Sequence, residues 1–242
     1  QNPSKGVNGS ITLGADLNKN NKVTMLYYFS NYNSKGESVE GFSLPSRAND
    51  NEFQYHSFRL SETFIANENL INQFRVSATY QSSRDFGGSN EVAVNVLEAF
   101  FGGGSQNNSS RKNLNFEVSN DTSWQKNKYS VNFGWQIRGA FINQTSTSNY
   151  GGTYTFSGRT APVLDANNNP VTGQVTQIDS LETYRRTLLF KQLGFSAAQI
   201  RSLGGGASQF TISGGNPIVS VKHLDAAGYL QNTYKLKENL AV

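Results

Sequence analysis

The sequence contains no cysteine, and this absence removes two classes of architecture. Without thiols, the 242-residue chain forms neither a disulfide framework nor a thiolate metal site. It also has no uninterrupted apolar run of about 18 residues, which excludes a transmembrane helix. A membrane β-barrel is not excluded on that ground, because the strands of such a barrel are only half apolar.

Charge is also sparse. The chain carries 21 Lys and Arg against 17 Asp and Glu, a formal net charge of +4, and its basic residues are scattered. A nucleic-acid-binding protein usually concentrates Lys and Arg in a patch or stripe. We therefore expect no nucleic-acid partner.

Catalytic and cofactor motifs are missing as well. His56 and His223 have no recognisable motif beside them, and no G-x-S-x-G nucleophile turn occurs. The glycine runs at 102–104 and 204–206 lack the lysine and the strand–turn–helix context of a phosphate loop, so we interpret them as flexible loop. We expect no enzymatic activity, no metal site and no cofactor.

What the chain does have is alternation. In YSVNFGWQIR (129–138), apolar or aromatic residues alternate with small, polar or charged ones, which predicts a β-strand with one apolar and one polar face. Similar runs begin at Ile11, Val23, Phe74 and Leu114. Several continue for ten or more residues, beyond the usual five or six of a soluble strand.

The connections between these runs alternate in length. Short polar turns are predicted at 18–21, 66–70, 125–128 and 237–239. Long polar segments lie between them, at roughly 33–51, 82–111 and 143–220. Short turns at one end and long loops at the other are typical of bacterial outer-membrane barrels. We therefore predict an all-β fold, an antiparallel transmembrane β-barrel segment of about eight strands over 1–242, with long extracellular loops.

The longest of these loops, 143–220, is predicted to be partly helical. Asp179 with Glu182, and Ser196 with Gln199, form capping-box patterns, and Gly194 ends the first helix. We expect two short helices that pack on each other through apolar side chains, namely Leu181, Tyr184, Leu188, Ile200 and Leu203. Such a segment is a folded lid and not a linker between domains.

Four stretches resemble TonB-dependent outer-membrane transporters, and most closely their Oar-like branch. They are FSLPSRANDNEFQYHSFRLSETFIANENLINQFRVSATYQ, APVLDANNNPV, IDSLETYRRTLLFKQLGFSAAQIRSLGGGASQFTISGGNP and YLQNTYKLKENLAV. The resemblance implies a 22-stranded barrel with a plug inside it and a TonB-binding box upstream. Neither plug nor TonB box is recognisable, so we expect a middle section of the barrel, with the plug and TonB complex engaged through parts outside this chain.

The alternation of the strands and the composition of the long loop also indicate candidate site residues. If the aromatic residues face lipid, then Asp16, Arg75, Glu117 and Arg138 face the lumen. There we expect them to hydrate the wall or hold the plug by ion pairs, and the alternative is that they contact cargo. Glu62 is expected on the lipid face near a turn, where a charge costs less than at the midplane. The basic residues Arg185, Arg186, Lys191 and Arg201 of the long loop are candidates for cargo binding, although a solvated helix face also accounts for them.

The sequence therefore favours part of a TonB-dependent transporter in the cell outer membrane, taking up an unknown scarce solute. Its other expected partners are outer-membrane lipid and lipopolysaccharide. The rival is a soluble or surface-assembled β-sheet adhesin or lectin-like binding protein. These hypotheses differ in where the aromatic face of 129–137 lies, because an adhesin packs it against a second sheet. Trp124, Tyr129 and Tyr234 are predicted to form an interfacial aromatic belt.

Overall fold

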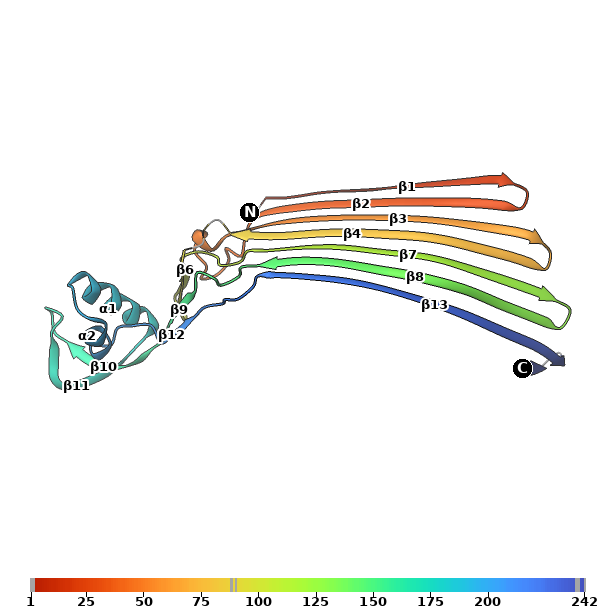
Figure 1. Cartoon of the computed structure of the whole chain (residues 1–242). Helices are drawn as coiled ribbons and strands as arrows, with labels where there is room; N and C mark the ends of the chain where they lie inside the picture. The colour runs from red at the N-terminus through yellow and green to blue at the C-terminus, as the bar shows by residue number, and fades with distance from the viewer. Residues whose placement is uncertain (1–2, 88, 90, 238–239, 242) are drawn as a thin grey trace.

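The computed structural model describes residues 3–87, 89, 91–237 and 240–241. One antiparallel eight-stranded sheet dominates it, in the order β1-β2-β3-β4-β7-β8-β13-β14 (Figure 1). The strands are β1 (Ser4–Asn18), β2 (Asn21–Glu37), β3 (Asn49–Asn67), β4 (Leu70–Gly87), β7 (Ser109–Lys126), β8 (Tyr129–Ser146), β13 (Ile218–Lys237) and β14 (Leu240–Ala241). The predicted all-β, antiparallel architecture is confirmed.

Short turns join these strands at one end of the sheet, and asparagine shapes several of them. The Oδ1 atom of Asn18 accepts a hydrogen bond from the Asn20 backbone N–H at 2.9 Å, and Asn67 does the same for Asn69 at 2.9 Å. In the turn between β7 and β8, Asn127 adopts a φ of 53°, a left-handed conformation that asparagine tolerates. The last predicted turn, at 237–239, lies partly outside the described residues.

The strands extend further than their apolar patterns predict. The long connections cover 38–48, 88–108 and 147–217, so the predicted boundaries at 33–51, 82–111 and 143–220 were wrong by several residues at each end. Most residues of these extra strand segments are polar, with Phe86, Ile218 and Val219 as exceptions. Asn33, Glu52 and Arg84 pair across β2, β3 and β4. The backbone ladder does not depend on side-chain polarity, so it continues where the hydrophobic pattern has ended.

The register gives the sheet two chemically different faces. One row of directly paired residues crosses the sheet from β1 to β13: Leu13, Met25, Leu60, Val76, Val118, Ile137 and Ala226. We call the side that carries this row and the aromatic residues of β8 the apolar face, and the opposite side the polar face. Phe133 and Trp135 are 46% and 43% exposed on the apolar face, and no second sheet covers it among the described residues.

Aromatic residues lie at the turn end of the apolar face. The rings of Tyr129 and Tyr234 pair across β8 and β13 with centroids 4.8 Å apart, and Trp124 lies on β7 opposite Val131. This is the end of the sheet at which the sequence predicts an interfacial belt.

Polar residues on the apolar face are hydrogen-bonded to one another. Asn72 donates to Asn120 at 2.9 Å and to Thr122 at 2.7 Å. Glu62 lies on this face as expected, and its Oε1 atom accepts from Asn21 at 2.7 Å. Mutual pairing lowers the cost of placing these groups on an apolar surface.

The three long connections fold together into one body, which we call the cap (38–48, 91–108 and 147–217). Its sheet has the order β12-β9-β5-β6 and takes strands from two connections, with β5 parallel to β9. The third connection joins through a bridge between Ser43 and Phe101. The cap elements are η1 (Pro45–Arg47), β5 (Ala93–Val96), β6 (Phe100–Gly102), β9 (Thr153–Phe156), β10 (Arg159–Leu164), β11 (Pro170–Ile178), α1 (Ser180–Gln192), α2 (Ala197–Ser202) and β12 (Gln209–Thr211).

The buried hydrophobic core of the described residues lies in the cap and not on the long sheet. It comprises Ala93, Val96, Phe156, Ala161, Phe190 and Ile200. Figure 1 shows the cap beyond the end of the sheet opposite the short turns. None of the helices in the described part of the chain has the length and apolar character needed to span a membrane.

Candidate functional site: the polar face and the cap

A polar network crosses four strands on the polar face. Tyr229 on β13 reaches over Gly134 on β8 and donates its hydroxyl to Asp121 Oδ1 on β7 at 2.8 Å. On its other side, Asp121 forms an ion pair with Arg75 on β4. A Cβ at Gly134 would lie 2.8 Å from the Tyr229 ring and 2.6 Å from the Asn120 carbonyl oxygen, so this crossing requires glycine.

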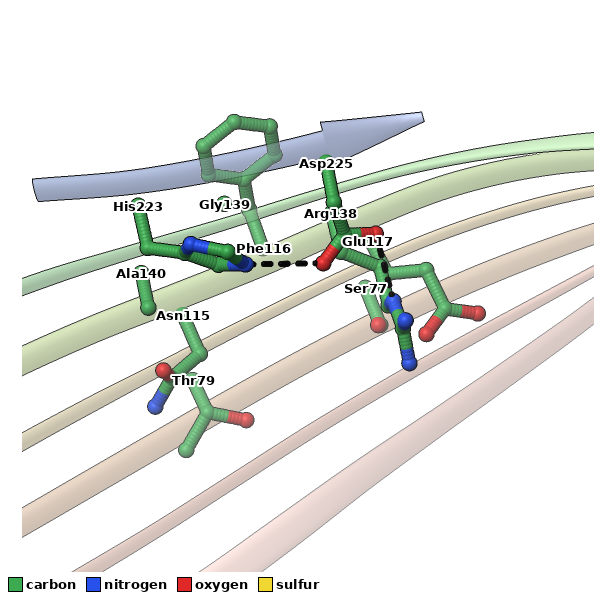
Figure 2. Close-up of a pocket in the computed structure, with 10 residues that line it drawn as sticks. All are labelled: Ser77, Thr79, Asn115, Phe116, Glu117, Arg138, Gly139, Ala140, His223 and Asp225. Carbon is green, nitrogen blue, oxygen red and sulfur yellow. Dashed lines mark hydrogen bonds and ion pairs between the residues drawn. The ribbon is translucent and has the colours of Figure 1, made fainter. Parts of the chain in front are cut away.

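A second charged group lies nearer the cap, around a hollow of about 360 Å³ (Figure 2). Arg138 Nε donates to Asp225 at 3.0 Å, and His223 Nε2 lies 3.0 Å from the other oxygen of the same carboxylate. Glu117 is the direct cross-strand partner of Arg138, yet its carboxylate makes no ion pair within the part of the chain that the structure describes. Thr79 and Asn115 complete the hydrogen-bonding lining. The hollow is open and polar, and within the described residues no His, Asp and Glu side chains are grouped as metal ligands.

Aromatic side chains occupy the polar face close to the cap. Tyr28 and Tyr55 make an edge contact with ring centroids 5.8 Å apart, and Tyr32 and Phe53 are direct partners across β2 and β3. Sequence reasoning missed this group, although Tyr28 interrupts the alternation in its strand. Rings on an otherwise polar wall offer flat apolar surface beside hydrogen-bonding groups.

The predicted lumen-facing residues Asp16, Arg75, Glu117 and Arg138 all lie on the polar face. Arg75, Glu117 and Arg138 fall within the two charged groups, whereas Asp16 pairs across the ladder with Lys22 near a short turn. Opposite charges are thus interleaved along the wall. The partners Asp225 and Tyr229 were not predicted, because they are brought together by strand register.

The two predicted helices of the long loop are present. The Asp179 carboxylate accepts from the Glu182 backbone N–H at 2.7 Å, and Ser196 and Gln199 form the full reciprocal capping box. The predicted packing was wrong in part: Leu181 and Leu188 are 49% and 50% exposed. The buried face of α1 consists instead of Ser180, Thr183, Arg186 and Phe190.

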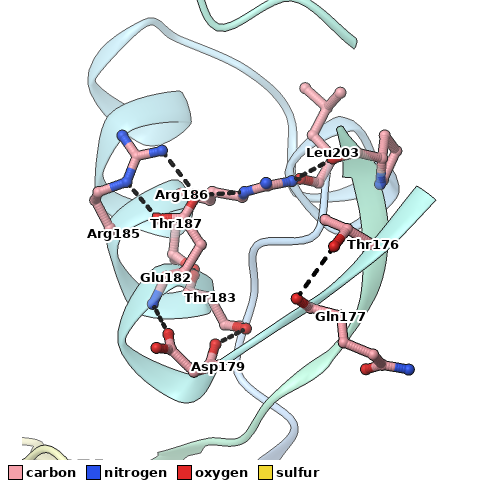
Figure 3. A network of polar contacts seen from close by, with 10 residues as sticks. Thr176, Gln177, Asp179, Glu182, Thr183, Arg185, Arg186, Thr187 and Leu203 are labelled. Carbon is pink, nitrogen blue, oxygen red and sulfur yellow. Dashed lines mark hydrogen bonds and ion pairs between the residues drawn. The ribbon is translucent and has the colours of Figure 1, made fainter. Parts of the chain in front are cut away.

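The reason is that an arginine forms the centre of the cap (Figure 3). Arg186 donates to the carbonyl oxygens of Pro162 at 2.8 Å and Leu203 at 2.9 Å, and to Glu182 at 2.7 Å. It ties α1 to the β10 strand and to the segment after α2. Because it is buried and its donors are used inside the cap, Arg186 is not placed to meet a ligand.

Glu182 stands between two arginines. Arg185 Nε donates to it at 2.5 Å, and Arg186 approaches from the other side. Hydrogen bonds from Arg185 first, and then from Arg186, lower the pKa of the Glu182 carboxyl to about 2. The carboxylate therefore stays charged at any physiological pH.

Lys191 and Arg201 are exposed, and Arg185 is half exposed although paired with Glu182. The glycines at 204–206, interpreted as flexible, are fixed in place: Gly206 N–H donates to Thr187 Oγ1 at 2.7 Å, and a Cβ at Gly204 would lie 2.4 Å from that of Ala161. They allow the chain to pass close to the cap core.

A family model described as an outer membrane beta barrel domain matches residues 1–242. Neither a curated protein nor a solved structure matches the chain. In such barrels the apolar face contacts lipid, the polar face lines the lumen, and the long loops lie on the extracellular side. The uncovered apolar face, the charged polar face and the length of the strands agree with that family. The chain belongs to the outer membrane beta barrel domain family and is a protein of the outer membrane.

Proposed function

We propose that this domain forms part of the wall of a TonB-dependent transporter, of Oar-like type, that takes up a scarce solute across the outer membrane. The observation that carries the proposal is the arrangement of the polar face, where interleaved charges and aromatic rings lie directly beneath a folded cap. The resemblance of the YRRTLLFKQLGF loop supports the same assignment. A wall of this kind offers a passing solute hydrogen bonds and ring surface without a single deep binding pocket.

In this proposal the cap is an extracellular lid that meets cargo first. Lys191, Arg201 and the exposed side of Arg185 are the groups available to an anionic or hydrogen-bonding solute. Arg186 serves the cap fold instead. The domain performs no chemical step on its cargo.

The wall would also hold a plug. Glu117 has no ion-pair partner among the described residues, and Arg59 is exposed on the same row of the polar face. Such groups can pair with charges on a plug domain that occupies the lumen. Energy would reach that plug from the inner membrane through TonB, by parts outside this chain.

The test is energy-dependent uptake. Cells that produce the full-length protein are given a panel of scarce solutes, and accumulation is measured with and without an inner-membrane proton gradient. We expect at least one solute whose uptake needs both the protein and the gradient. The double variant Lys191→Glu/Arg201→Glu should reduce that uptake.

The matched control is Lys19→Glu/Lys128→Glu, with the same charge change in the short turns at the opposite end of the sheet. Uptake that persists without the gradient would identify a passive pore and overturn the proposal. Equal loss in both double variants would remove the cap from cargo recognition.

A further inference from the structure

Cations mark the outer margin of the lipid-facing surface. On β7, Lys112 precedes Leu114, the first apolar residue of that face. On β13, Lys222 precedes Leu224 on the same face, and Ile218 lies nearer the cap beyond Ser220. On β4, Arg84 is the first charged residue beyond Tyr80 on this face. All three side chains are exposed, and none makes an ion pair with another described residue.

The positions of these cations shift along the sheet from one strand to the next, as expected for residues at one depth in a barrel of tilted strands. The continuous apolar surface reaches further toward the cap on β4, where it extends to Tyr80, than on β13, where it extends to Leu224. Phe86 and Ile218 lie on the same face, separated from this surface by polar or charged residues. The cations shift in the same direction: Arg84 lies nearest the cap, Lys112 one row further from it, and Lys222 one row further again. Barrel strands tilt by about 35–45°, so positions that descend across successive strands lie at a similar depth.

Lys112 and Lys222 flank β8 and share one surface. From strand spacing and rise their Cα atoms are about 12 Å apart. Asn143 lies on β8 directly opposite Lys112, and Ser220 lies next to it on β13 and donates to it at 2.8 Å. Below them, on the lipid side, the Phe141 ring stacks on Phe116 with centroids 6.1 Å apart.

The residues that surround Lys112 and Lys222 favour the binding of an anion there. On β3, Glu52 lies directly opposite Arg84, so the charge of Arg84 is partly offset. The direct cross-strand partners of Lys112 are Ser82 and Asn143, and that of Lys222 is Phe141, so neither lysine faces a carboxylate there. Flexible ammonium groups are suited to bind phosphate as point charges.

We propose that Lys112 and Lys222, together with Asn143 and Ser220, form a binding site for the phosphate groups of anionic lipids in the outer leaflet. The ring of Phe141 and the side chain of Leu224 contact the first part of the acyl chains. The polar group above the apolar surface selects an amphiphile over a free anion. This lipid site requires only that the protein is an outer-membrane barrel, and it does not depend on any transport activity.

The experiment uses the protein folded in detergent micelles that contain dioleoyl phosphatidylglycerol or dioleoyl phosphatidylcholine, with bound lipid counted by native mass spectrometry. Wild-type protein should retain the anionic lipid preferentially. Lys112→Gln/Lys222→Gln should reduce that preference by about 30-fold. This value follows because each lysine near an anionic surface contributes about 1 kcal/mol to binding.

The control is Lys126→Gln/Lys128→Gln, which removes two charges at the opposite end of the same strands. Heat-modifiable mobility verifies that both variants are folded, and a Lys112→Arg/Lys222→Arg variant, which keeps both charges, should retain the preference. An unchanged preference in the glutamine variant at 112 and 222, or an equal loss in the control, would overturn the site. Displacement of the lipid by millimolar inorganic phosphate would show that the site binds free phosphate and would also overturn it.

Discussion

Replacement of Arg186 by methionine should open the cap while the barrel stays folded. The substitution keeps most of the side-chain volume but removes the donors to Glu182 and to the Pro162 and Leu203 carbonyl oxygens. Glu182 keeps its ion pair with Arg185, so the main cost comes from the two carbonyl oxygens. Each carbonyl left without a donor costs about 1–3 kcal/mol, so the two together cost about 2–6 kcal/mol.

Hydrogen exchange measured by mass spectrometry reports this loss, because exchange within the cap follows local opening. At 1.4 kcal/mol per factor of ten, amides of α1 and β9 should exchange roughly one to four orders of magnitude faster. Arg185→Met is the control, since its half-exposed ion pair is worth about 0–1 kcal/mol. Equal acceleration in both variants would refute the role assigned to Arg186.

Three further predictions concern charge and packing. Because the Glu182 pKa is lowered to about 2, its stabilisation of the cap should be complete above about pH 4.5 and lost as pH falls toward 2; Glu182→Gln should flatten this pH dependence of protease resistance. Phe133→Arg should cost about 2–4 kcal/mol and reduce the folded band in heat-modifiable mobility, whereas Arg75→Leu should affect uptake more than insertion. Gly134→Val should cost about 1–3 kcal/mol in urea unfolding, while Gly14→Val, with open space at its Cβ, should cost little.

The strands could be predicted because their pattern is local. In β8, the alternation from Tyr129 to Ile137 fixes which residues share a face, and the register bears this out. The strand ends could not be located, since Asn33 and Glu52 continue the ladder without a hydrophobic signal.

The cap was harder to predict because its contacts are distant in sequence. The helices were found from their capping residues, Asp179 and Ser196. The sheet that joins β5 to β9 has strands of only a few residues, which carry no periodicity. Apolar residues of α1 were expected to pack inside the cap. Arg186 is buried there instead, because it donates hydrogen bonds to carbonyl groups from other segments. The sequence alone does not show which distant carbonyl groups lie within reach of this arginine.

Two of the hairpin connections share one small sheet, and the third is bridged to it between Ser43 and Phe101. This arrangement has a consequence for variation at the cell surface. An antibody or phage that recognises the cap would contact a discontinuous epitope, and a change in one connection disturbs the others through the β5–β9 pairing. The β10–β11 tip is the exception, since Asp165 closes it locally on the backbone N–H groups of Asn167 and Asn169. Sequence drift and tag insertion should therefore be tolerated at this tip and resisted at β5 and β9.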